Sequence, residues 1–389
     1  MLAGVELSAQ FYPAKVYTTM DGLPSNAIYD AVQADNGEMW FVTSNGITVY
    51  DAHEWYLFPD SLGLPHDNSS NLVKASDGSL WLMGVRLNDA VLCHFKDAVW
   101  NCDNLPESWS QYSTYQFDVR ARPSGYEIVL GRGNKVYHKP PNEKGWDEYR
   151  IDSLDPEDNF NSVQYLDSTF FLNTPVGQFE FNEGELKKSS YNHLLPGDKH
   201  VILMQPDEDR MYVLGFKWIG YVEDDEWHLI TRDTGLEVKS FYGRHSLVID
   251  NRDRIFYHSL SPVRMVDAET GKTRVMAIEG RQQNILSNRI LLDRENNIWS
   301  VDNRGLFKFN LLKFENYNRD SGLADDEVTT IFEASDGLVY VSNVNHLNVF
   351  RDGEIIRKYE LPGAKDLLNI RILDIAEDKN GDILLASNQ

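Results

Sequence analysis

The sequence predicts an all-β fold built from repeated four-stranded antiparallel blades, and three observations lead to this prediction. A core made of an apolar strand, an Asp/Asn/Gly turn and an aromatic-led strand recurs about every 43 residues. A second turn then leads into a third strand, as in AVQADNGEMWFVTSNGITVYD at residues 31–51. No convincing amphipathic helix interrupts this pattern. Short strands repeated at this period are typical of a β-propeller.

The copies align on the residue that leads the second strand. This position is occupied by Trp40, Trp81, Ile128, Phe170, Tyr212, Phe256, Trp299, Tyr340 and Leu384. We interpret it as the packing residue between neighbouring blades, because large aromatic side chains dominate protein cores. In the first copy the four strands are expected at 27–32, 39–43, 47–50 and 54–58. Gly, Asn and Asp fill the turns because tight hairpins need positive φ there.

The two ends of the chain indicate how the nine copies are grouped. Tyr17 and Tyr317 each precede a Gly-Leu pair by five residues, so a lone outer strand feeds a new first blade at both places. A propeller must close its ring or leave a sheet edge exposed. We therefore expect the strand at 14–19 to complete the last blade of a seven-bladed propeller spanning 11–311. Residues 312–389 would begin a second, incomplete propeller of a longer protein. The alternative is one ring of eight or nine blades.

Charge and hydropathy exclude some classes of function. The net charge is −23 and the pI is about 4.8, which argues against nucleic acid as a partner. No apolar stretch approaches the ~18 residues that span a bilayer. The first ten residues, MLAGVELSAQ, could be the tail of a secretory signal peptide that is cleaved near Ser8-Ala9-Gln10. A cloning remnant or a frayed end would give the same sequence.

The chain has two cysteines, Cys93 and Cys102, in VLCHFKDAVWNCDN. This segment is predicted to be a hairpin that turns at Asp97-Ala98, which places the two cysteines opposite each other across the strands. A disulfide can form in that register and would fit an oxidising compartment. The other interpretation is that two small residues happen to face each other.

Several copies share a longer motif. The first has Gly22-Leu23-Pro24-Ser25-Asn26, Asp35-Asn36-Gly37, Trp40, Thr43, Gly46 and Tyr50-Asp51; later copies keep Gly63-Leu64-Pro65, Asp77-Gly78, Trp81, Asp293, Trp299, Gly305-Leu306-Phe307, Gly322-Leu323 and Asp336-Gly337. These residues resemble the two-component regulator propeller repeat. The outer copies match it well, whereas the copies between residues 117 and 267 have lost most of its residues.

The resemblance implies a function. Proteins of this family are similar to periplasmic sensor halves of Bacteroidetes-type hybrid two-component systems, and many respond to breakdown products of polysaccharides. It therefore implies a periplasmic region that signals to a histidine kinase outside this chain. It also implies a homodimeric full-length receptor, held in the membrane by a transmembrane segment that is not in this chain. We expect no cofactor.

The sequence offers no convincing catalytic or metal-binding set. The ten histidines show no metal-ligand spacing. The turn Asp378-Lys379-Asn380-Gly381-Asp382 loosely resembles a calcium loop but lacks the remaining ligands. His245 and His258 resemble a propeller lyase or hydrolase site only weakly, and structural roles for them are more common. We therefore expect neither a metal nor a catalytic centre.

Basic residues recur at the turns between second and third strands. In a propeller these turns share a face with the loops that lead into the blades, and that face is a common binding surface. Arginine can bind a carboxylate or sulfate through two hydrogen bonds, and tryptophan can stack on a sugar. The expected ligand-binding residues are Arg86, Arg132, Lys217, Trp218, Arg264 and Arg304. The alternative is that they are solvated turn residues.

Three functions remain open. The first is a non-enzymatic sensor region that binds an oligosaccharide or another small molecule, or relays its binding. The second is a propeller lyase or hydrolase acting on a polysaccharide or a small cyclic substrate. The third is a scaffold for protein contacts. A histidine with an acidic or metal partner in a central cleft would favour the enzyme, and a flat apolar face without a pocket would favour the scaffold.

Overall fold

The fold is described from a computed structural model. The structure describes residues 14–58, 67–86, 89–106, 116–157, 160–166, 168–196, 201–207, 210–215, 217–232, 234, 245–259, 263–276, 287–302, 304–310, 317–319, 322–351, 353–362 and 369–388. The chain divides into two compact units, Pro13–Leu311 and the C-terminal Leu312–Gln389, the latter grouped with Met1–Tyr12. The segment around Ser8, expected to be a cleavage region, lies outside the described residues.

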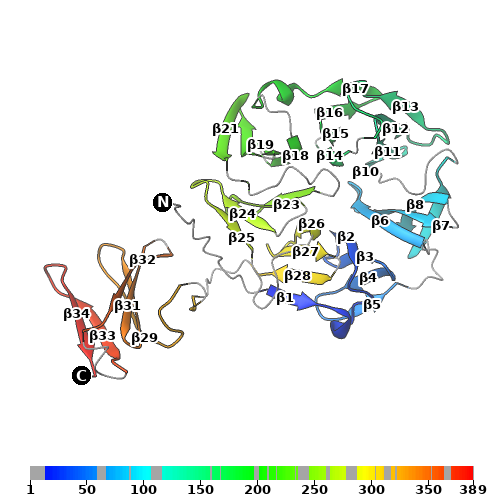
Figure 1. The fold of residues 1–389 in the computed structure, drawn as a ribbon. Helices are drawn as coiled ribbons and strands as arrows, with labels where there is room; N and C mark the ends of the chain where they lie inside the picture. The colour runs from blue at the N-terminus through cyan, green and yellow to red at the C-terminus, as the bar shows by residue number, and fades with distance from the viewer. Residues whose placement is uncertain are drawn as a thin grey trace. The chain divides into compact units, whose positions relative to one another are not determined.

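The larger unit consists of antiparallel four-stranded sheets, arranged as blades around a ring (Figure 1). The prediction of a seven-bladed β-propeller followed by the first blades of another is confirmed. Blade 1 consists of β2 (Ile28–Gln33), β3 (Met39–Thr43), β4 (Gly46–Tyr50) and β5 (Trp55–Leu57), and blade 2 of β6 (Asp67–Lys74), β7 (Leu80–Arg86), β8 (Asp89–Lys96) and β9 (Val99–Asn104). Blade 3 consists of β10 (Gln116–Arg122), β11 (Gly125–Arg132), β12 (Lys135–Lys139) and β13 (Asp147–Arg150). Blade 4 consists of β14 (Ser162–Leu166), β15 (Thr169–Thr174), β16 (Gly177–Asn182) and β17 (Glu185–Lys188).

The remaining blades follow the same order, and the N-terminal strand completes the last one. Blade 5 consists of β18 (Val201–Asp207), β19 (Arg210–Gly215), β20 (Ile219–Glu223) and β21 (Glu226–Thr231). Blade 6 consists of β22 (His245–Ile249), β23 (Arg254–Ser259), β24 (Arg264–Asp267) and β25 (Thr273–Val275). Blade 7 consists of β26 (Ser287–Leu292), β27 (Ile298–Asp302), β28 (Gly305–Phe309) and β1 (Ala14–Tyr17). Strand β1 pairs with β28 from Ala14–Phe309 to Tyr17–Leu306, so strands from the two ends of the unit share one sheet. In the described part of the chain, the short 3-10 helices η1 (Thr19–Asp21) and η3 (Ser190–His193) lie between blades in sequence.

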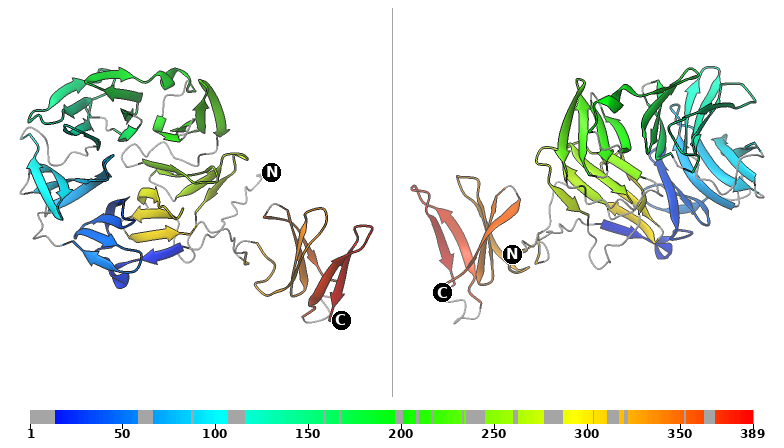
Figure 2. Two further views of the ribbon diagram at one scale, coloured as in Figure 1. Left: turned by 180° about the vertical axis from the view of Figure 1, so that it is seen from behind. Right: turned by 45° about the horizontal axis from the view of Figure 1, so that its top comes forward.

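The core lies between neighbouring blades. Trp40 of blade 1 is buried in a cluster with Leu82 and Trp100 of blade 2. Trp299 of blade 7 is stacked on Tyr17, with ring centroids 5.8 Å apart, and lies in one cluster with Phe41 of blade 1. The aromatic residues Trp40 and Trp299, which lead second strands, therefore join their blades to the next blade of the ring. Figure 2 shows the same unit from two further directions.

A β-bulge recurs in the innermost strands. Its position is counted from the residue of the innermost strand that pairs with the lead residue of the second strand. The bulge lies just before the residue two positions earlier in the chain. In blade 1 the register shifts between Ile28 and Asp30, and in blade 7 between Ser287 and Arg289. Blade 3 pairs regularly from Gln116 to Arg122. A bulge changes the direction of the side chains beside it. Residues with the same role in blades 1 and 3 therefore differ by one position when they are counted from the partner of the lead residue.

The second unit contains one four-stranded sheet and one hairpin. These are β29 (Val328–Glu333), β30 (Val339–Asn343), β31 (His346–Arg351) and β32 (Glu354–Glu360), followed by β33 (Ile372–Glu377) and β34 (Ile383–Ser387). Leu347, Ile372 and Ile375 are buried in a cluster shared by the sheet and the hairpin. This packing repeats the blade-to-blade contact of the larger unit.

Candidate ligand-binding channel

The innermost strands of the seven-bladed unit enclose a cavity of about 690 Å³. Residues of β2, β6, β10, β14, β22 and β26 line it. Its wall is rich in polar groups, including the side chains of Asn71, Gln116 and Gln164. A cavity of this size is in the usual range for small-molecule sites. It is the candidate functional site, because it combines volume with hydrogen-bonding groups from several blades.

Asp30 joins three blades at one side of the channel. Its Oδ1 accepts the N–H of Ala31 at 2.8 Å, and its Oδ2 accepts the N–H of Leu72 in blade 2 at 2.8 Å. Nη1 of Arg289, from blade 7, lies 2.6 Å from Oδ1. The Asp30 side chain is only 2% exposed. A buried carboxylate needs such partners, because burial without them is costly.

Asp118 repeats this arrangement in blade 3. Its Oδ1 accepts the N–H of Val119 at 2.7 Å, and its Oδ2 accepts the N–H of Tyr165 in blade 4 at 2.8 Å. Burial raises the pKa of Asp118 to about 7, although the two N–H groups and the charge of Arg289 act in the opposite direction. Asp118 lines the cavity, so its carboxyl can exchange a proton near neutral pH at the place where a ligand would bind.

A second cavity of about 340 Å³ adjoins this part of the wall. It shares Lys74, Asp118 and Tyr165 with the larger cavity and is also lined by the turn residues Asp35 and Ser76. These residues place it at the turns between first and second strands. The guanidinium of Arg120 lies 5.2 Å from the centre of the Tyr165 ring, which holds that ring in place.

Acidic partners hold the cations near these cavities. Nζ of Lys74 lies 3.0 Å from Oδ1 of Asp35, and Nη2 of Arg294 lies 3.6 Å from the same oxygen. Arg294 also donates from Nη1 to the backbone oxygen of Asp35 at 2.7 Å. With Arg289 paired to Asp30, these cations are engaged in joining blades 7, 1 and 2.

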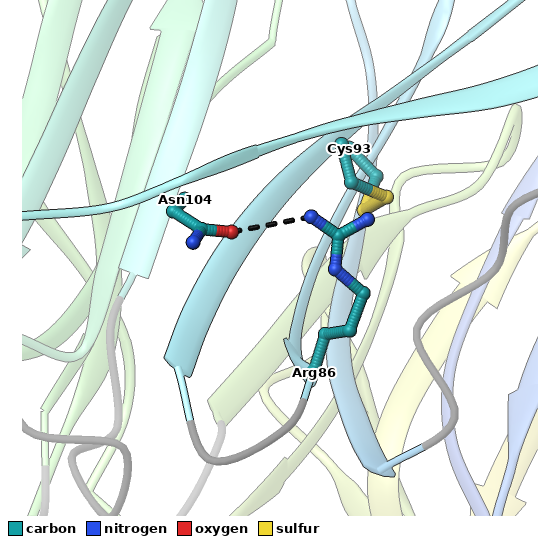
Figure 3. Close-up of a disulfide and its surroundings, with 4 residues drawn as sticks. Arg86, Cys93 and Asn104 are labelled. Carbon is teal, nitrogen blue, oxygen red and sulfur yellow. Dashed lines mark hydrogen bonds between the residues drawn. A yellow bond between two sulfur atoms is a disulfide. The ribbon is translucent and has the colours of Figure 1, made fainter.

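The residues predicted to bind ligand lie apart from both cavities, at turns of five different blades. Arg86, Arg132 and Arg264 are half-buried, whereas Lys217 and Arg304 are exposed. Arg86 donates from Nη2 to Oδ1 of Asn104 in its own blade at 3.2 Å (Figure 3). None of these five residues lines either cavity. Their contact with a ligand remains a prediction.

For Trp218 the prediction is wrong. Its side chain is 1% exposed and packs in a cluster with Met211, Val213 and Val222. Its ring also meets the ring of Trp227 edge-on, with centroids 5.1 Å apart. Trp218 therefore cannot stack on a sugar. The sequence suggested a turn residue, but the chain returns at once into β20 and carries this side chain into the core between blades 4 and 5.

The other candidate residues have structural positions. His258 is fully buried in β23 and lines neither cavity, while the side chain of His245 lies outside the described residues. Oδ1 of Asp378 accepts the N–H groups of Asn380 and Asp382 at 2.8 and 3.0 Å, so this carboxylate holds its own turn. Cys93 and Cys102 are joined in a disulfide between β8 and β9 (Figure 3).

The channel acids were missed because they lie inside strands that were expected to be apolar. Asp30 interrupts the run from Ile28 to Val32, and Asp118 stands between Phe117 and Val119. A charged residue inside an otherwise apolar inner strand was the available signal. Their hydrogen-bond partners, Leu72 and Tyr165, are more than 40 residues away in sequence, so the sequence does not show which residues they meet.

Comparison with known proteins gives three results. Residues 22–45 match the model of the two component regulator propeller family. No curated protein sequence matches the chain. The fold, however, is similar to that of many solved structures.

Three of these structures illustrate the range. Two extracellular domains of putative hybrid two component systems from B. thetaiotaomicron are 14% and 15% identical, with TM-scores of 0.62 and 0.54; the alignments cover 96% and 97% of this chain but only 52% and 51% of those domains. A catalytically inactive virginiamycin B lyase from Staphylococcus aureus, with quinupristin, is 12% identical, with a TM-score of 0.56, and the alignment covers 77% of this chain and all of the lyase.

At these identities the structural likeness establishes the fold. This chain spans about half of the length of the two extracellular domains. The part of the chain that the structure describes contains no helix long and apolar enough to cross a bilayer. The match at residues 22–45 confirms the resemblance expected from Gly22-Leu23-Pro24 and Trp40, and it identifies the chain as one that carries the two component regulator propeller repeat.

Proposed function

We propose that this chain is the extracytoplasmic ligand-sensing region of a hybrid two-component sensor. In this proposal it binds an oligosaccharide derived from a polysaccharide and controls a histidine kinase outside this chain. The observation that carries the proposal is the polar cavity of about 690 Å³ in the channel of the seven-bladed unit. Carboxylate and amide side chains from several blades converge there, and such groups bind sugar hydroxyls by hydrogen bonds.

Two further observations support an extracytoplasmic sensor. The chain carries the two component regulator propeller repeat, and its fold is similar to that of extracellular domains of hybrid two component systems. The disulfide Cys93–Cys102 fits an oxidising compartment such as the periplasm. A receptor of this kind would pass ligand binding on through two arrangements with different ligand affinities, and we propose that it works as a homodimer.

The test is binding of oligosaccharides to the purified chain. A panel of neutral and acidic oligosaccharides from plant and host polysaccharides would be screened by thermal shift and then by calorimetry. A specific ligand should stabilise the fold by about 2.7 kcal/mol at a hundredfold excess over its Kd. If no oligosaccharide of a broad panel binds, the proposal is overturned for this chain.

A matched pair of variants would locate the site. Gln116 lines the channel at the start of β10, and Gln116→Trp should fill the cavity and abolish binding. Glu226→Trp places the same side chain on the exposed strand β21 and should leave binding unchanged. If binding survives Gln116→Trp but is lost in Arg132→Ala or Arg304→Ala, the site is on the turns rather than in the channel.

No specific observation favours the enzymatic alternative. His258 is fully buried and does not line the channel. Among the described residues, no three His, Cys, Asp or Glu side chains gather as a metal site would require.

A further inference from the structure

Asp30 and Asp118 use their carboxylates in the same way but differ in one partner. Each accepts the N–H of the following residue and the N–H of a residue in the next blade. Asp30 is also paired with Arg289 at 2.6 Å. Within the described part of the chain, Asp118 has no cation within 4 Å of its carboxylate. Asp30 and Asp118 thus differ in whether a cation lies directly against the carboxylate.

Counting along the repeat identifies the residue that corresponds to Arg289 in the blade before Asp118. Arg289 lies two residues before the strand partner of Trp299, in the blade that precedes Asp30. In the blade that precedes Asp118, the residue two positions before the partner of Trp81 is Asn71. Both residues follow a bulge and line the channel. Asn71 in blade 2 therefore holds the position of the repeat that Arg289 holds in blade 7, with an amide in place of a guanidinium.

The charged groups around Asp118 are committed elsewhere. Lys74 of β6 is bonded to Asp35, and Arg289 of β26 is bonded to Asp30. On its own strand, Arg120 lies over the Tyr165 ring of β14 and 3.7 Å from Glu127 of β11.

A carboxylate offers roughly four lone-pair sites, and two backbone N–H groups occupy only part of them. We propose that Asp118 anchors the channel ligand by binding a cationic group, such as an ammonium, in the place that Arg289 fills beside Asp30. Buried charges in proteins are paired, because an unpaired one is costly. This inference rests on the proposed function, since it assigns a chemical group to the ligand of the same cavity.

The test compares two probes that differ in one group. 2-Aminoethyl cellobioside carries an ammonium, and 2-hydroxyethyl cellobioside of equal size carries a hydroxyl. The ammonium probe should bind about tenfold more tightly, because a hydrogen bond between charged groups is stronger than one to a neutral hydroxyl. Calorimetry at pH 7 in buffers of different ionisation enthalpy should show release of about half a proton per bound ammonium probe, given a pKa of about 7 for Asp118. The hydroxyl probe should release none.

Three variants make the result specific. Asn71→Arg should supply the internal cation and remove the preference for the ammonium probe while the protein stays folded, because Arg289 occupies the equivalent position in blade 7. Asp118→Asn should also remove both the preference and the proton release. The control is Asp374→Asn in the second unit. Oδ1 of Asp374 accepts the N–H of Ile375 as Oδ1 of Asp118 accepts that of Val119. This variant should change neither the preference for the ammonium probe nor the proton release. If Asp118→Asn does not fold, the Asn71→Arg variant and the proton count of the unaltered protein decide the question.

The outcomes separate this inference from the proposed function. Equal affinity for the two probes, or no proton release, overturns the inference. If another oligosaccharide of the panel binds in the channel but the ammonium probe does not, the inference fails and the proposed function stands. If the ammonium probe binds with proton release while no oligosaccharide without an amine binds, Asp118 is the anchor and the proposed oligosaccharide ligand is wrong.

Discussion

Asp30 and Arg289 occupy the same position of the repeat in neighbouring blades and form an ion pair of 2.6 Å where the ring closes. Asp30 pairs with Val42, two residues after Trp40, and Arg289 pairs with Val301, two residues after Trp299. Blade 1 and blade 7 are the first and last blades of the ring, so this pair joins ends that are 259 residues apart. Together with strand β1 it closes the propeller.

Removal of the arginine should weaken this closure. Arg289→Ala leaves a carboxylate that is 2% exposed without its cation, and we expect a loss of about 1–3 kcal/mol in the free energy of unfolding. The measurement is urea denaturation followed by tryptophan fluorescence, because all nine tryptophans lie in the seven-bladed unit. Arg304→Ala, at an exposed turn of the same blade, is the control and should stay within about 0.5 kcal/mol of the unaltered protein. Equal losses in the two variants would contradict the assignment.

The sequence predicted the repeat because the residues that define each copy lie close together in the chain. Trp40 and Trp299 lead strands, and turns such as Asp35-Asn36-Gly37 lie within a few residues of them, so each copy can be read without knowing its neighbours. The seven-bladed grouping could be predicted because a ring has to close, and the repeated tyrosines Tyr17 and Tyr317 mark where each ring starts. The cross-blade partners were not predictable in this way, because Asp30 meets Leu72 and Arg289 only through the closed ring.

Trp218 and Gly215 depend on each other. A Cβ atom at Gly215 would lie 2.7 Å from Cε2 of Trp218, closer than real contacts allow. Gly215→Ala should therefore destabilise the protein by about 1–3 kcal/mol through overpacking, and Trp218→Ala by about 3–5 kcal/mol through the lost core volume. The double variant should lose less than the sum, because the cavity left by Trp218 accommodates the new methyl group.

Denaturation of the two single variants and the double variant measures this coupling. Strictly additive losses would show that the two residues do not share one packing site. Phe171→Ala is a useful comparison, because Phe171 is half-buried at the edge of the same cluster; its effect should add to that of Gly215→Ala without compensation.

The error at Trp218 shows a limit of pattern reasoning. Lys217 and Trp218 stand together at a turn, and a turn position gives no information on which side chain points outward. The structure separates them: Lys217 is exposed and Trp218 is buried. Channel residues such as Asp118 show the reverse case, because the innermost strands were expected to be apolar, yet their polar residues form part of the cavity wall.

The disulfide should stabilise blade 2. Cys93 and Cys102 close a short loop, with a sequence separation of 9, and the loss of a crosslink of this length is expected to cost about 2–3 kcal/mol. The double variant Cys93→Ser/Cys102→Ser should therefore melt at a lower temperature than the oxidised protein. A reducing agent should lower the melting temperature of the unaltered protein and leave the double variant unchanged. No difference between the oxidised and the reduced protein would contradict this prediction.

Asp118 should give the stability of the seven-bladed unit a distinctive dependence on pH. Its folded-state pKa is about 7, raised by burial from the ordinary value of 3.8. Between these two values the folded state binds more protons at this site than the unfolded state. The stabilisation is therefore complete below about pH 4 and is lost as the pH rises towards 7, by at most about 1.4 kcal/mol per pH unit.

Other groups act in the opposite direction, so a difference between proteins has to be measured. Although burial of Glu127 raises its pKa, its hydrogen bonds to His138 and Arg122 outweigh this and lower it, and its stabilisation is lost as the pH falls. The free energy of unfolding of Asp118→Asn is therefore subtracted from that of the unaltered protein at each pH, which removes the contributions of other titrating groups. The difference in the free energy of unfolding should fall from pH 4 to pH 7 and level off above it. A flat difference would mean that folding does not raise the pKa of Asp118, and the proton release expected on binding of an ammonium ligand would then not occur.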